Sequence, residues 1–268
     1  MNDAVDHRVP VYVIHMASQP KRWDVLMERL SAFPNLHTLL VDAIDGRAVP
    51  EEVRSRNISP LYPCYTGYST MTAGEYGCGM SHHKAHGLFL DSGAPFAVVL
   101  EDDVLLSPDS DNAIQTVTPL LEVPEPRILL LSCRLIVFRK PFAMFGRYTV
   151  YRVLEGGGAY GYALNRAAAK VLRHRHLPFR APCDWWLVVR QMGIRVLALT
   201  PHVASYRDGL REDSTIEADR KNLWSRERGQ RLPVRLQWGF FLHRTWPIIY
   251  RKFLSRLGQL AFLDKQWE

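Results

Sequence analysis

The 268-residue sequence predicts an α/β protein with a mainly parallel central sheet. Two observations predict this class. About forty residues near the start form an apolar strand, a helix and a second strand, an order typical of neighbouring parallel strands. Later apolar runs at 96–100 and 128–131 are also strand-like. A composition of 47% hydrophobic and 23% charged residues excludes long disorder, collagen and coiled-coil rods.

The first strand is predicted at residues 9–16, which are almost wholly apolar. Ser18 and Pro20 then mark a helix start, with Ser18 as the cap and Pro20 in the first turn. The second strand is predicted at residues 37–42. Ligands of such sheets bind beyond the carboxyl ends of the strands, so residues just after them are the first candidates for a site.

The rest of the main domain continues this pattern. The predicted elements are a long surface loop (50–73), a helix (74–90), a buried strand (96–100), further strands (128–131 and 160–164), a helix (166–172) and a last strand (196–199). No internal repeat is present. We place the main domain at residues 1–223.

Residues 224–268 form a basic, aromatic-rich segment that predicts an amphipathic helical tail. The whole chain has a net charge of +7. From Arg220 onward there are 11 Lys or Arg and 3 acidic residues, so the excess belongs to this tail. Two uses are open: the tail binds an anionic membrane surface, or it packs on the main domain with a solvated basic face. Nucleic acid is not an expected partner, because no recognition motif accompanies the charge.

The cysteines and the N-terminus predict a cytoplasmic protein. Cys64, Cys78, Cys133 and Cys183 include no CxxC pair, so neither a zinc knuckle nor a redox dithiol is indicated, and Cys78 is expected to pack as a small hydrophobe. The first sixteen residues match neither a signal peptide nor a membrane anchor.

Three adjacent carboxylates, Glu101, Asp102 and Asp103, follow the apolar strand 96–100 directly. They repel one another unless a cation neutralises them, and oxygen ligands suit divalent ions. Glu101 and Asp103 point to the same side of an extended chain, so they can share a metal ion while Asp102 faces away or caps a helix. A solvated acidic turn is the alternative.

Several segments, in the same order, make the sequence resemble glycosyltransferase family 25, the bacterial lipooligosaccharide galactosyltransferases and their collagen-galactosyltransferase relatives. They cover residues 9–217 and include VYVIHMASQPKRWDVLMERL, GEYGCGMSHHKAH, FAVVLEDDVLL, GGGAYGYALNRAAAKVL, APCDWWL and HVASYRDGLREDSTI, the first continuing to VDAIDGRAV. The resemblance implies a Rossmann-like nucleotide-sugar domain of the GT-A type, a UDP-hexose donor, Mn²⁺ or Mg²⁺, and transfer with inversion at the anomeric carbon.

The resemblance also implies roles for particular residues. Glu101 and Asp103 would hold the metal ion on the diphosphate. His202 is the expected third ligand because borderline divalent ions accept imidazole beside carboxylates, and Asp208 or Asp213 are competing choices. Asp184 matches the family's Pro-x-Asp segment and would be the catalytic base; the alternative is a simple helix cap. The expected donor-binding residues are His15, Arg22, Asp45, Gly46, Ser81, His82 and Asp102.

On the acceptor side, Trp185 and Asp213 are the expected binding residues. Trp185 and Trp186 are adjacent, so only one of them can face a cleft while the other packs in the core. Four of the donor residues also have a structural alternative: a solvated arginine for Arg22, a tight turn for Asp45 and Gly46, and a core histidine for His82.

The sequence therefore predicts an inverting, metal-dependent hexosyltransferase using UDP-galactose or UDP-glucose. The expected acceptor is a lipooligosaccharide or lipopolysaccharide core, and the expected location is the cytoplasmic face of the bacterial inner membrane. Two alternatives stay open: a metal-dependent phosphoesterase, and a non-catalytic module that binds membrane surfaces.

Overall fold

A computed structural model describes residues 8–132, 134–206, 215–227 and 234–263. The strands are β1 (Val9–His15), β2 (Leu36–Asp42), β3 (Phe96–Glu101), β4 (Val104–Leu106), β5 (Arg127–Leu130), β6 (Leu135–Phe145), β7 (Tyr148–Gly156), β8 (Gly161–Asn165), β9 (Arg195–Thr200), β10 (Ala204–Tyr206) and β11 (Leu260–Leu263). The helices are α1 (Pro20–Leu30), α2 (Glu51–Arg56), α3 (Tyr62–Thr66), α4 (Ala73–Asp91), α5 (Ser110–Val117), α6 (Arg166–Arg175), α7 (Trp186–Gln191), α8 (Thr215–Glu227), α9 (Val234–Phe240) and α10 (Trp246–Arg256).

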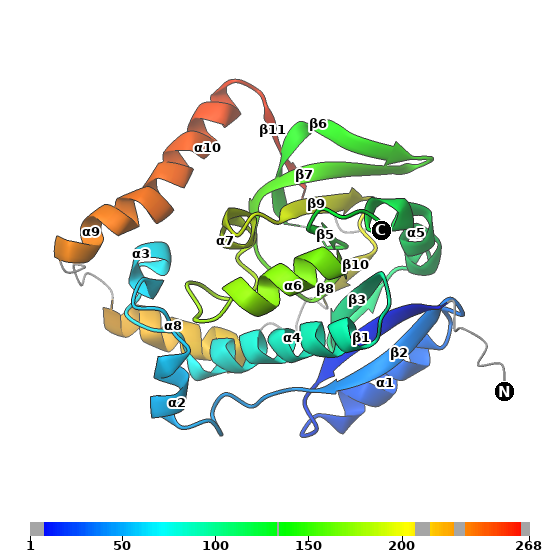
Figure 1. The fold of residues 1–268 in the computed structure, drawn as a ribbon, viewed down its shortest axis with the longest axis horizontal. Helices are drawn as coiled ribbons and strands as arrows, with labels where there is room; N and C mark the ends of the chain where they lie inside the picture. Colours follow the sequence, from blue (N-terminus) through cyan, green and yellow to red (C-terminus); the bar gives the residue numbers. More distant parts are fainter. Residues whose placement is uncertain (1–7, 133, 207–214, 228–233, 264–268) are drawn as a thin grey trace.

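The centre of the molecule is a nine-stranded sheet in the order β11-β6-β7-β9-β5-β8-β3-β1-β2 (Figure 1). Pairing is parallel between β1 and β2, β1 and β3, and β5 and β9. The other pairs are antiparallel, because β8 runs back between β3 and β5 and the β6–β7 hairpin extends the edge. The expected Rossmann-like α/β class is confirmed, with a mixed sheet.

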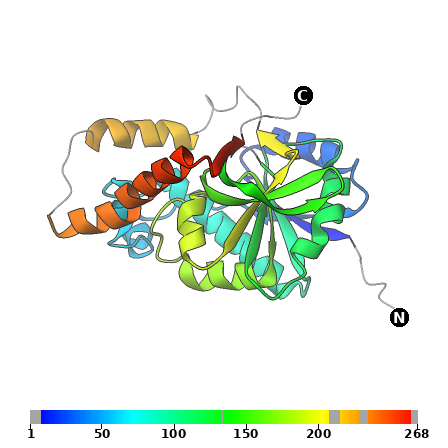
Figure 2. The same cartoon turned by 90° about the horizontal axis from the view of Figure 1, so that it is seen from above.

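Helices cover both faces of this sheet (Figure 2). Alternate residues of one strand point to opposite faces, so Tyr12 and Ile14 join the core under α4, α6 and α7, while Val11 and Val13 join the core under α1 and α5. The strands at the centre of the sheet are therefore buried on both sides, which explains their nearly continuous apolar sequences.

The N-terminal elements lie close to their expected positions. Helix α1 begins at Pro20 as predicted, but its N-cap is Gln19 and makes no side-chain hydrogen bond, so the predicted Ser18 cap is wrong. Helix α4 begins after Thr72, whose hydroxyl accepts a hydrogen bond from the Glu75 amide while the Glu75 carboxylate accepts one from the Thr72 amide. This capping box explains why a helix rich in glycine starts firmly here.

The predicted surface loop at 50–73 is wrong in part. It contains the short helices α2 and α3, and it buries Tyr62 and Met71 in a small core with Phe179. The sequence lacks a clear helical period because these helices are only five or six residues long, and α3 is held by its buried tyrosines.

The C-terminal segment joins the main sheet. After α9, a π-helical turn at Phe241–Thr245 and α10, strand β11 pairs antiparallel with β6 at the sheet edge (Figure 1). The expected boundary at residue 224 falls inside α8. None of the helices in the described ranges has the length and apolar character needed to cross a membrane.

Candidate active site

The acidic triplet lies at the edge of the sheet where the parallel strands β1 and β3 both end. Asp102 is held from the β1 side: its Oδ2 lies 2.7 Å from His15 Nδ1, and its Oδ1 accepts a 3.5 Å hydrogen bond from Arg22 in α1. These contacts bring together three of the predicted donor-site residues. Asp102 thus turns away toward β1 and does not cap the next helix, α5, whose N-cap is Asp109.

Asp103 has the opposite environment. Its Oδ1 is buried and has no hydrogen-bond partner. Burial, followed by the charges of Glu101 and Asp102, raises the pKa of Asp103 to about 7. A carboxylate oxygen that is buried, unpartnered and close to two other carboxylates is suited to a divalent cation.

Glu101 connects this edge to helix α4. Its Oε1 lies 3.1 Å from His82 Nε2 and 4.0 Å from Cys78 Sγ. Burial alone would lower the pKa of His82, but the neighbouring Cys78 and Glu101 raise it to about 10. His82 and Glu101 therefore form an ion pair, and His82 also contacts Tyr162 through its other ring nitrogen. His82 is both a core histidine and a neighbour of the triplet.

Ser81, Asp45 and Gly46 form the junction between β2 and α4. The Ser81 hydroxyl accepts a hydrogen bond from the Ile44 amide at 2.8 Å and donates one to the Gly77 carbonyl at 2.7 Å. A Cβ at Gly46 would overlap the Ala73 carbonyl oxygen. Asp45 is exposed and accepts a hydrogen bond from the Arg47 amide. Ser81 and Gly46 thus hold the backbone at this junction, and only the Asp45 side chain is open to solvent.

Asp184 lies just before α7, and it is not the cap of that helix. The N-cap position belongs to Trp185, which makes no side-chain cap hydrogen bond. Asp184 Oδ2 accepts a 3.1 Å hydrogen bond from the Gly158 amide. Its Oδ1 makes no hydrogen bond, and the nearest cation is Arg220 in α8 at 3.9 Å. One carboxylate oxygen is therefore fixed by a hydrogen bond, while the other makes none and has only the Arg220 charge beside it.

A groove of about 330 Å³ lies beside Asp184 and is lined on one side by Gly157 and Trp185. Gly157 borders Asp184, since a Cβ there would lie 3.7 Å from Asp184 Oδ2. The opposite side comes from the C-terminal segment, including Arg244, whose guanidinium lies 5.0 Å from the Trp185 ring centre. Trp186 is buried and donates to the Gly158 carbonyl, so the two tryptophans divide between groove and core as expected.

The family of the chain follows from its sequence. The family model described as glycosyltransferase family 25 (LPS biosynthesis protein) matches residues 8–187. The chain belongs to glycosyltransferase family 25. All the residues of the triplet and Asp184 lie inside the matched range, whereas the C-terminal wall of the groove lies outside it.

Three curated relatives of this family 25 chain are animal proteins. It is 34% identical over 97 residues to the probable inactive glycosyltransferase 25 family member 3 of Rattus norvegicus and to the inactive member 3 of Mus musculus. The probable inactive member 3 of Bos taurus is 35% identical over 97 residues. Each match spans 35% of this chain but only 16 to 17% of the relative.

Solved structures with similar folds are distant in sequence. One is a mannose-1-phosphate geranyltransferase of Thermus thermophilus, with 12% identity, a TM-score of 0.37, and coverage of 72% of this chain and 73% of the other. Another is a glycosyltransferase involved in glycosylation of the major capsid of PBCV-1, with 11% identity, a TM-score of 0.38, and coverage of 77% and 97%.

His202 is not brought to the triplet. It follows β9 and is buried, its Nδ1 has no hydrogen-bond partner, and burial lowers its pKa to about 4. Strand β10 pairs with β4 in a register that puts Tyr206 opposite Val104 and Ala204 opposite Leu106. Asp103 precedes β4 and is therefore at the Tyr206 end of the pair, whereas His202 precedes β10 and is at the opposite end. Asp208 and Asp213, the other predicted choices, lie outside the described residues.

Sequence reasoning missed Arg220 and the contact between Cys78 and Cys183. Arg220 donates a 2.7 Å hydrogen bond to Glu75 and so places its charge near Asp184, but nothing in the local sequence of α8 distinguishes it from other basic residues. The Sγ atoms of Cys78 and Cys183 lie 3.6 Å apart, which corrects the expectation that Cys78 only packs. The i, i+4 spacing of Cys78 and His82 indicates only that these two side chains lie on one face of α4.

Proposed function

We propose that this chain is an inverting, metal-dependent glycosyltransferase that moves galactose or glucose from its UDP-sugar to a lipooligosaccharide core. One observation carries the proposal. The short segment before β8 joins the two acidic centres: the Glu101 amide donates to the Tyr160 carbonyl at 3.0 Å, and the Gly158 amide donates to Asp184 Oδ2 at 3.1 Å. Both acidic centres are thus hydrogen-bonded to the same short segment, residues 158–160, and this supports a shared site.

Glu101 and Asp103 are the proposed ligands of Mn²⁺ or Mg²⁺. The buried Asp103 oxygen without a hydrogen bond supports this assignment. His202 is left out because it precedes β10, at the end of that strand away from Asp103. When bound, such a cation offsets the charge of the diphosphate and stabilises the departing UDP. No acid catalyst is then needed for the leaving group.

His15, Arg22, Asp45 and Asp102 are proposed to orient the donor. The Arg22 side chain is about one third exposed and is held by Asp102 at the ends of the strands. Its positive charge would there offset the negative charge of a diphosphate. The exposed Asp45 carboxylate is placed to accept hydrogen bonds from a ribose hydroxyl. Ser81, Gly46 and His82 act indirectly, by holding α4 against the edge of the sheet.

Asp184 is the proposed catalytic base. Its Oδ1 accepts the proton of the acceptor hydroxyl while that oxygen forms a bond to the anomeric carbon and the bond from this carbon to the UDP oxygen breaks. In this proposal the hydrogen bond from the Gly158 amide holds Oδ2 in place, and Oδ1, which makes no hydrogen bond within the protein, takes the proton. A single displacement of this kind inverts the anomeric carbon.

The groove beside Asp184 is the proposed acceptor site. Trp185 supplies an aromatic face for a sugar ring, and Arg244 and Arg251 supply positive charge for acidic groups of the acceptor. Asp213, the other predicted acceptor residue, stays a proposal, since it lies outside the described residues.

The first test measures UDP release from UDP-galactose and UDP-glucose with Mn²⁺ and a de-acylated lipooligosaccharide core. Asp184→Asn is expected to lower transfer by about 10²- to 10⁴-fold, the usual contribution of a general base. UDP should still bind to this variant, and the rise in melting temperature with UDP measures that binding. Asp91→Asn, at the exposed end of α4, is the matched control and should transfer normally.

The same experiment decides between the alternatives. The names of the curated relatives favour a second candidate, a non-catalytic binding protein, and UDP binding without any transfer would select it. Release of phosphate from phosphoesters, with no response to UDP, would instead select a phosphoesterase. Asp103→Asn should remove the part of the melting-temperature rise that depends on Mn²⁺; an unchanged rise contradicts the proposed cation site.

A further inference from the structure

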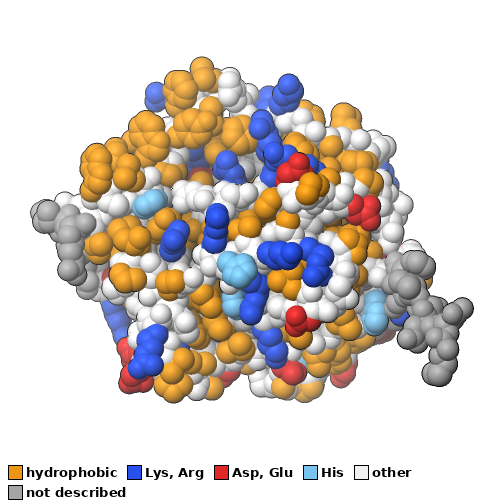
Figure 3. Space-filling view, viewed as in Figure 1, with side chains coloured by type: hydrophobic (Ala, Val, Ile, Leu, Met, Phe, Trp, Pro, Cys, Tyr) orange, Lys and Arg blue, Asp and Glu red, His pale blue; other side chains and the backbone are white. Residues whose placement is uncertain are grey.

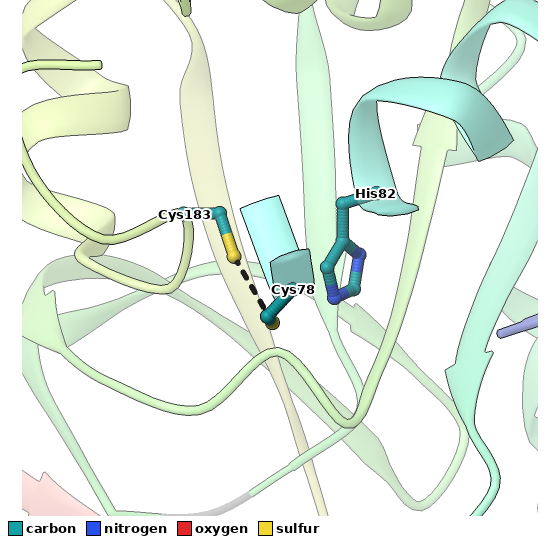
Figure 4. A group of neighbouring side chains, drawn as sticks. All are labelled: Cys78, His82 and Cys183. Carbon is teal, nitrogen blue, oxygen red and sulfur yellow. Dashed lines mark hydrogen bonds between the residues drawn. The ribbon is translucent and has the colours of Figure 1, made fainter. Parts of the chain in front are cut away.

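Three side chains with soft or borderline metal ligands converge beneath the acidic triplet. Cys78 and His82 lie one turn apart on α4, and Cys183 comes from the segment before α7 (Figure 4). Their ligand atoms all lie within 4.8 Å of one another, and among the described residues no other group of three His, Cys, Asp or Glu does so. A fourth ligand atom, Oε1 of Glu101, lies next to two of them.

The separations between these atoms are close to the edges of a zinc tetrahedron. With Zn–S bonds of about 2.3 Å and Zn–N or Zn–O bonds of about 2.1 Å, tetrahedral geometry gives about 3.8 Å between two sulfurs, about 3.6 Å between sulfur and oxygen, and about 3.4 Å between nitrogen and oxygen. The structure has 3.6 Å from Cys78 Sγ to Cys183 Sγ, 4.0 Å from Cys78 Sγ to Glu101 Oε1, and 3.1 Å from His82 Nε2 to Glu101 Oε1. These three of the six edges differ from the tetrahedral values by a few tenths of an ångström, and the edges among Cys78, His82 and Cys183 are all within 4.8 Å.

The hydrogen bonds of His82 leave Nε2 as its ligand atom. Its Nδ1 lies 2.9 Å from the Tyr162 hydroxyl, which in turn lies 2.8 Å from His86 Nε2. Burial lowers the pKa of His86, and a neutral His86 whose Nε2 carries no proton accepts the hydroxyl proton of Tyr162. The Tyr162 oxygen then accepts from His82 Nδ1, which is the partner that metal-bound histidines need on their other nitrogen.

We propose that Cys78, His82 and Cys183 bind a zinc ion, with Oε1 of Glu101 as the fourth ligand. Two thiolates and an imidazole select zinc over Mn²⁺ or Mg²⁺, which prefer oxygen ligands. The ion replaces the two thiol protons and the proton on His82 Nε2. It ties α4, the end of β3 and the segment carrying Asp184 into one unit, and it leaves the second oxygen of Glu101 for the cation proposed at Asp103. The zinc site does not rest on the transferase proposal.

The test is the metal content of the chain, expressed in the cytosol and purified without chelators or metal-affinity resin. Inductively coupled plasma mass spectrometry should find about one zinc per wild-type chain, in keeping with a closed structural site. Cys183→Ser and the Cys78→Ser/Cys183→Ser double variant should lose it. Cys64→Ser is the matched control: Cys64 is also buried but contacts the Leu236 carbonyl instead, so this variant should keep its zinc.

Two results would overturn the site. One is a wild-type zinc content no higher than that of the double variant; the other is a Cys78–Cys183 disulfide in the non-reduced chain, found by thiol alkylation and mass spectrometry. If the cysteine variants fail to fold, the wild-type chain decides alone: replacing zinc by Co²⁺ should produce thiolate-to-cobalt absorption, and a chain without that absorption contradicts the site. Neither readout uses donor or acceptor, so the result is independent of whether transfer is observed.

Discussion

Asp102 and Asp103 show how neighbouring carboxylates come to have different roles. The two residues lie in the turn between β3 and β4, where Asp102 hydrogen-bonds to His15 and Arg22 while Asp103 hydrogen-bonds to neither of them. The protein supplies the positive charge for Asp102 itself. It supplies no hydrogen bond to the buried oxygen of Asp103, and this asymmetry is why we assign the cation to Asp103 and Glu101.

A buried histidine away from this edge gives a prediction at the same scale. His176 ends α6, its Nδ1 has no hydrogen bond, and burial together with the nearby His83 and His82 lowers its pKa to about 3. Below the unfolded pKa of about 6.5 the unfolded chain binds a proton that the folded chain excludes. The contribution of neutral His176 to the free energy of unfolding is therefore fully present above pH 6.5 and is lost as the pH decreases toward 3.

The measurement is urea unfolding of wild type and His176→Leu at pH 7.5 and pH 5. We expect the wild-type chain to lose about 1 to 2 kcal/mol more than the variant between these values, the linkage contribution of one such histidine. His86 and His202, whose pKa values are also lowered by burial, leave some pH dependence in both chains. Equal losses in the two chains would show that His176 titrates normally in the folded state.

At the scale of elements, the sequence predicts segments whose side chains follow one period and meet one environment. Strands β1, β3 and β8 are buried on both faces, and their uninterrupted apolar runs made them predictable. The β6–β7 hairpin was missed because β6 contains Arg139 and Pro141, and Pro141 lies at an irregularity where the pairing register shifts. No alternating pattern survives such an interruption.

The residues of the candidate site also differ in whether local sequence could predict their positions. The triplet and Asp184 each follow or precede a recognisable element, so their places could be predicted from local sequence. The contact of Cys78 with Cys183 spans 105 positions and exists only because α4 packs beside the segment before α7. Arg220 reaches Glu75 and Asp184 from α8 in the same long-range way. Contacts of this kind depend on tertiary packing, which local spacing does not encode.

Two glycines of α4 provide a matched test of that packing. A Cβ at Gly77 would overlap the Ile44 carbonyl oxygen and the Gly46 amide nitrogen, which are both backbone atoms. Gly77→Ala should therefore destabilise the chain by about 1 to 3 kcal/mol, as overpacking does. At Gly87 the nearest atoms belong to the flexible Arg173 side chain at ordinary contact distances, so Gly87→Ala should stabilise by up to about 1 kcal/mol through helix propensity.

Thermal and urea unfolding of both variants checks this prediction. The two substitutions add the same methyl group to the same helix, so their difference isolates the contact between α4 and the β2 junction. Similar stabilities for Gly77→Ala and Gly87→Ala would mean that the junction can move away from α4 at little cost.

At the scale of the whole molecule, the structure shows one of the two uses that the sequence of the C-terminal segment left open, packing on the main domain. One side packs on the domain: His243 stacks on Tyr65 with ring centres 4.2 Å apart, Arg251 pairs with Glu155, and β11 extends the sheet. The other side stays exposed, and Figure 3 shows hydrophobic side chains gathered over α9 and α10. We propose that this face binds the anionic surface of the membrane that carries the acceptor, on the cytoplasmic side.

This face predicts lipid binding that can be measured with vesicles. Trp238, Trp246 and Phe253 are 70%, 54% and 57% exposed, and each ring that enters the interface contributes about 1 kcal/mol by its buried area. Trp238→Ala/Trp246→Ala/Phe253→Ala should therefore weaken co-sedimentation with anionic vesicles by about a hundredfold. Met144→Ala removes an equally exposed apolar side chain from β6 and should bind like wild type.

Because the charge of the segment attracts anionic headgroups, binding should also weaken with salt and in zwitterionic vesicles. Equal binding of the triple variant and wild type would exclude this face as the membrane contact and leave its exposed aromatic residues for a protein partner.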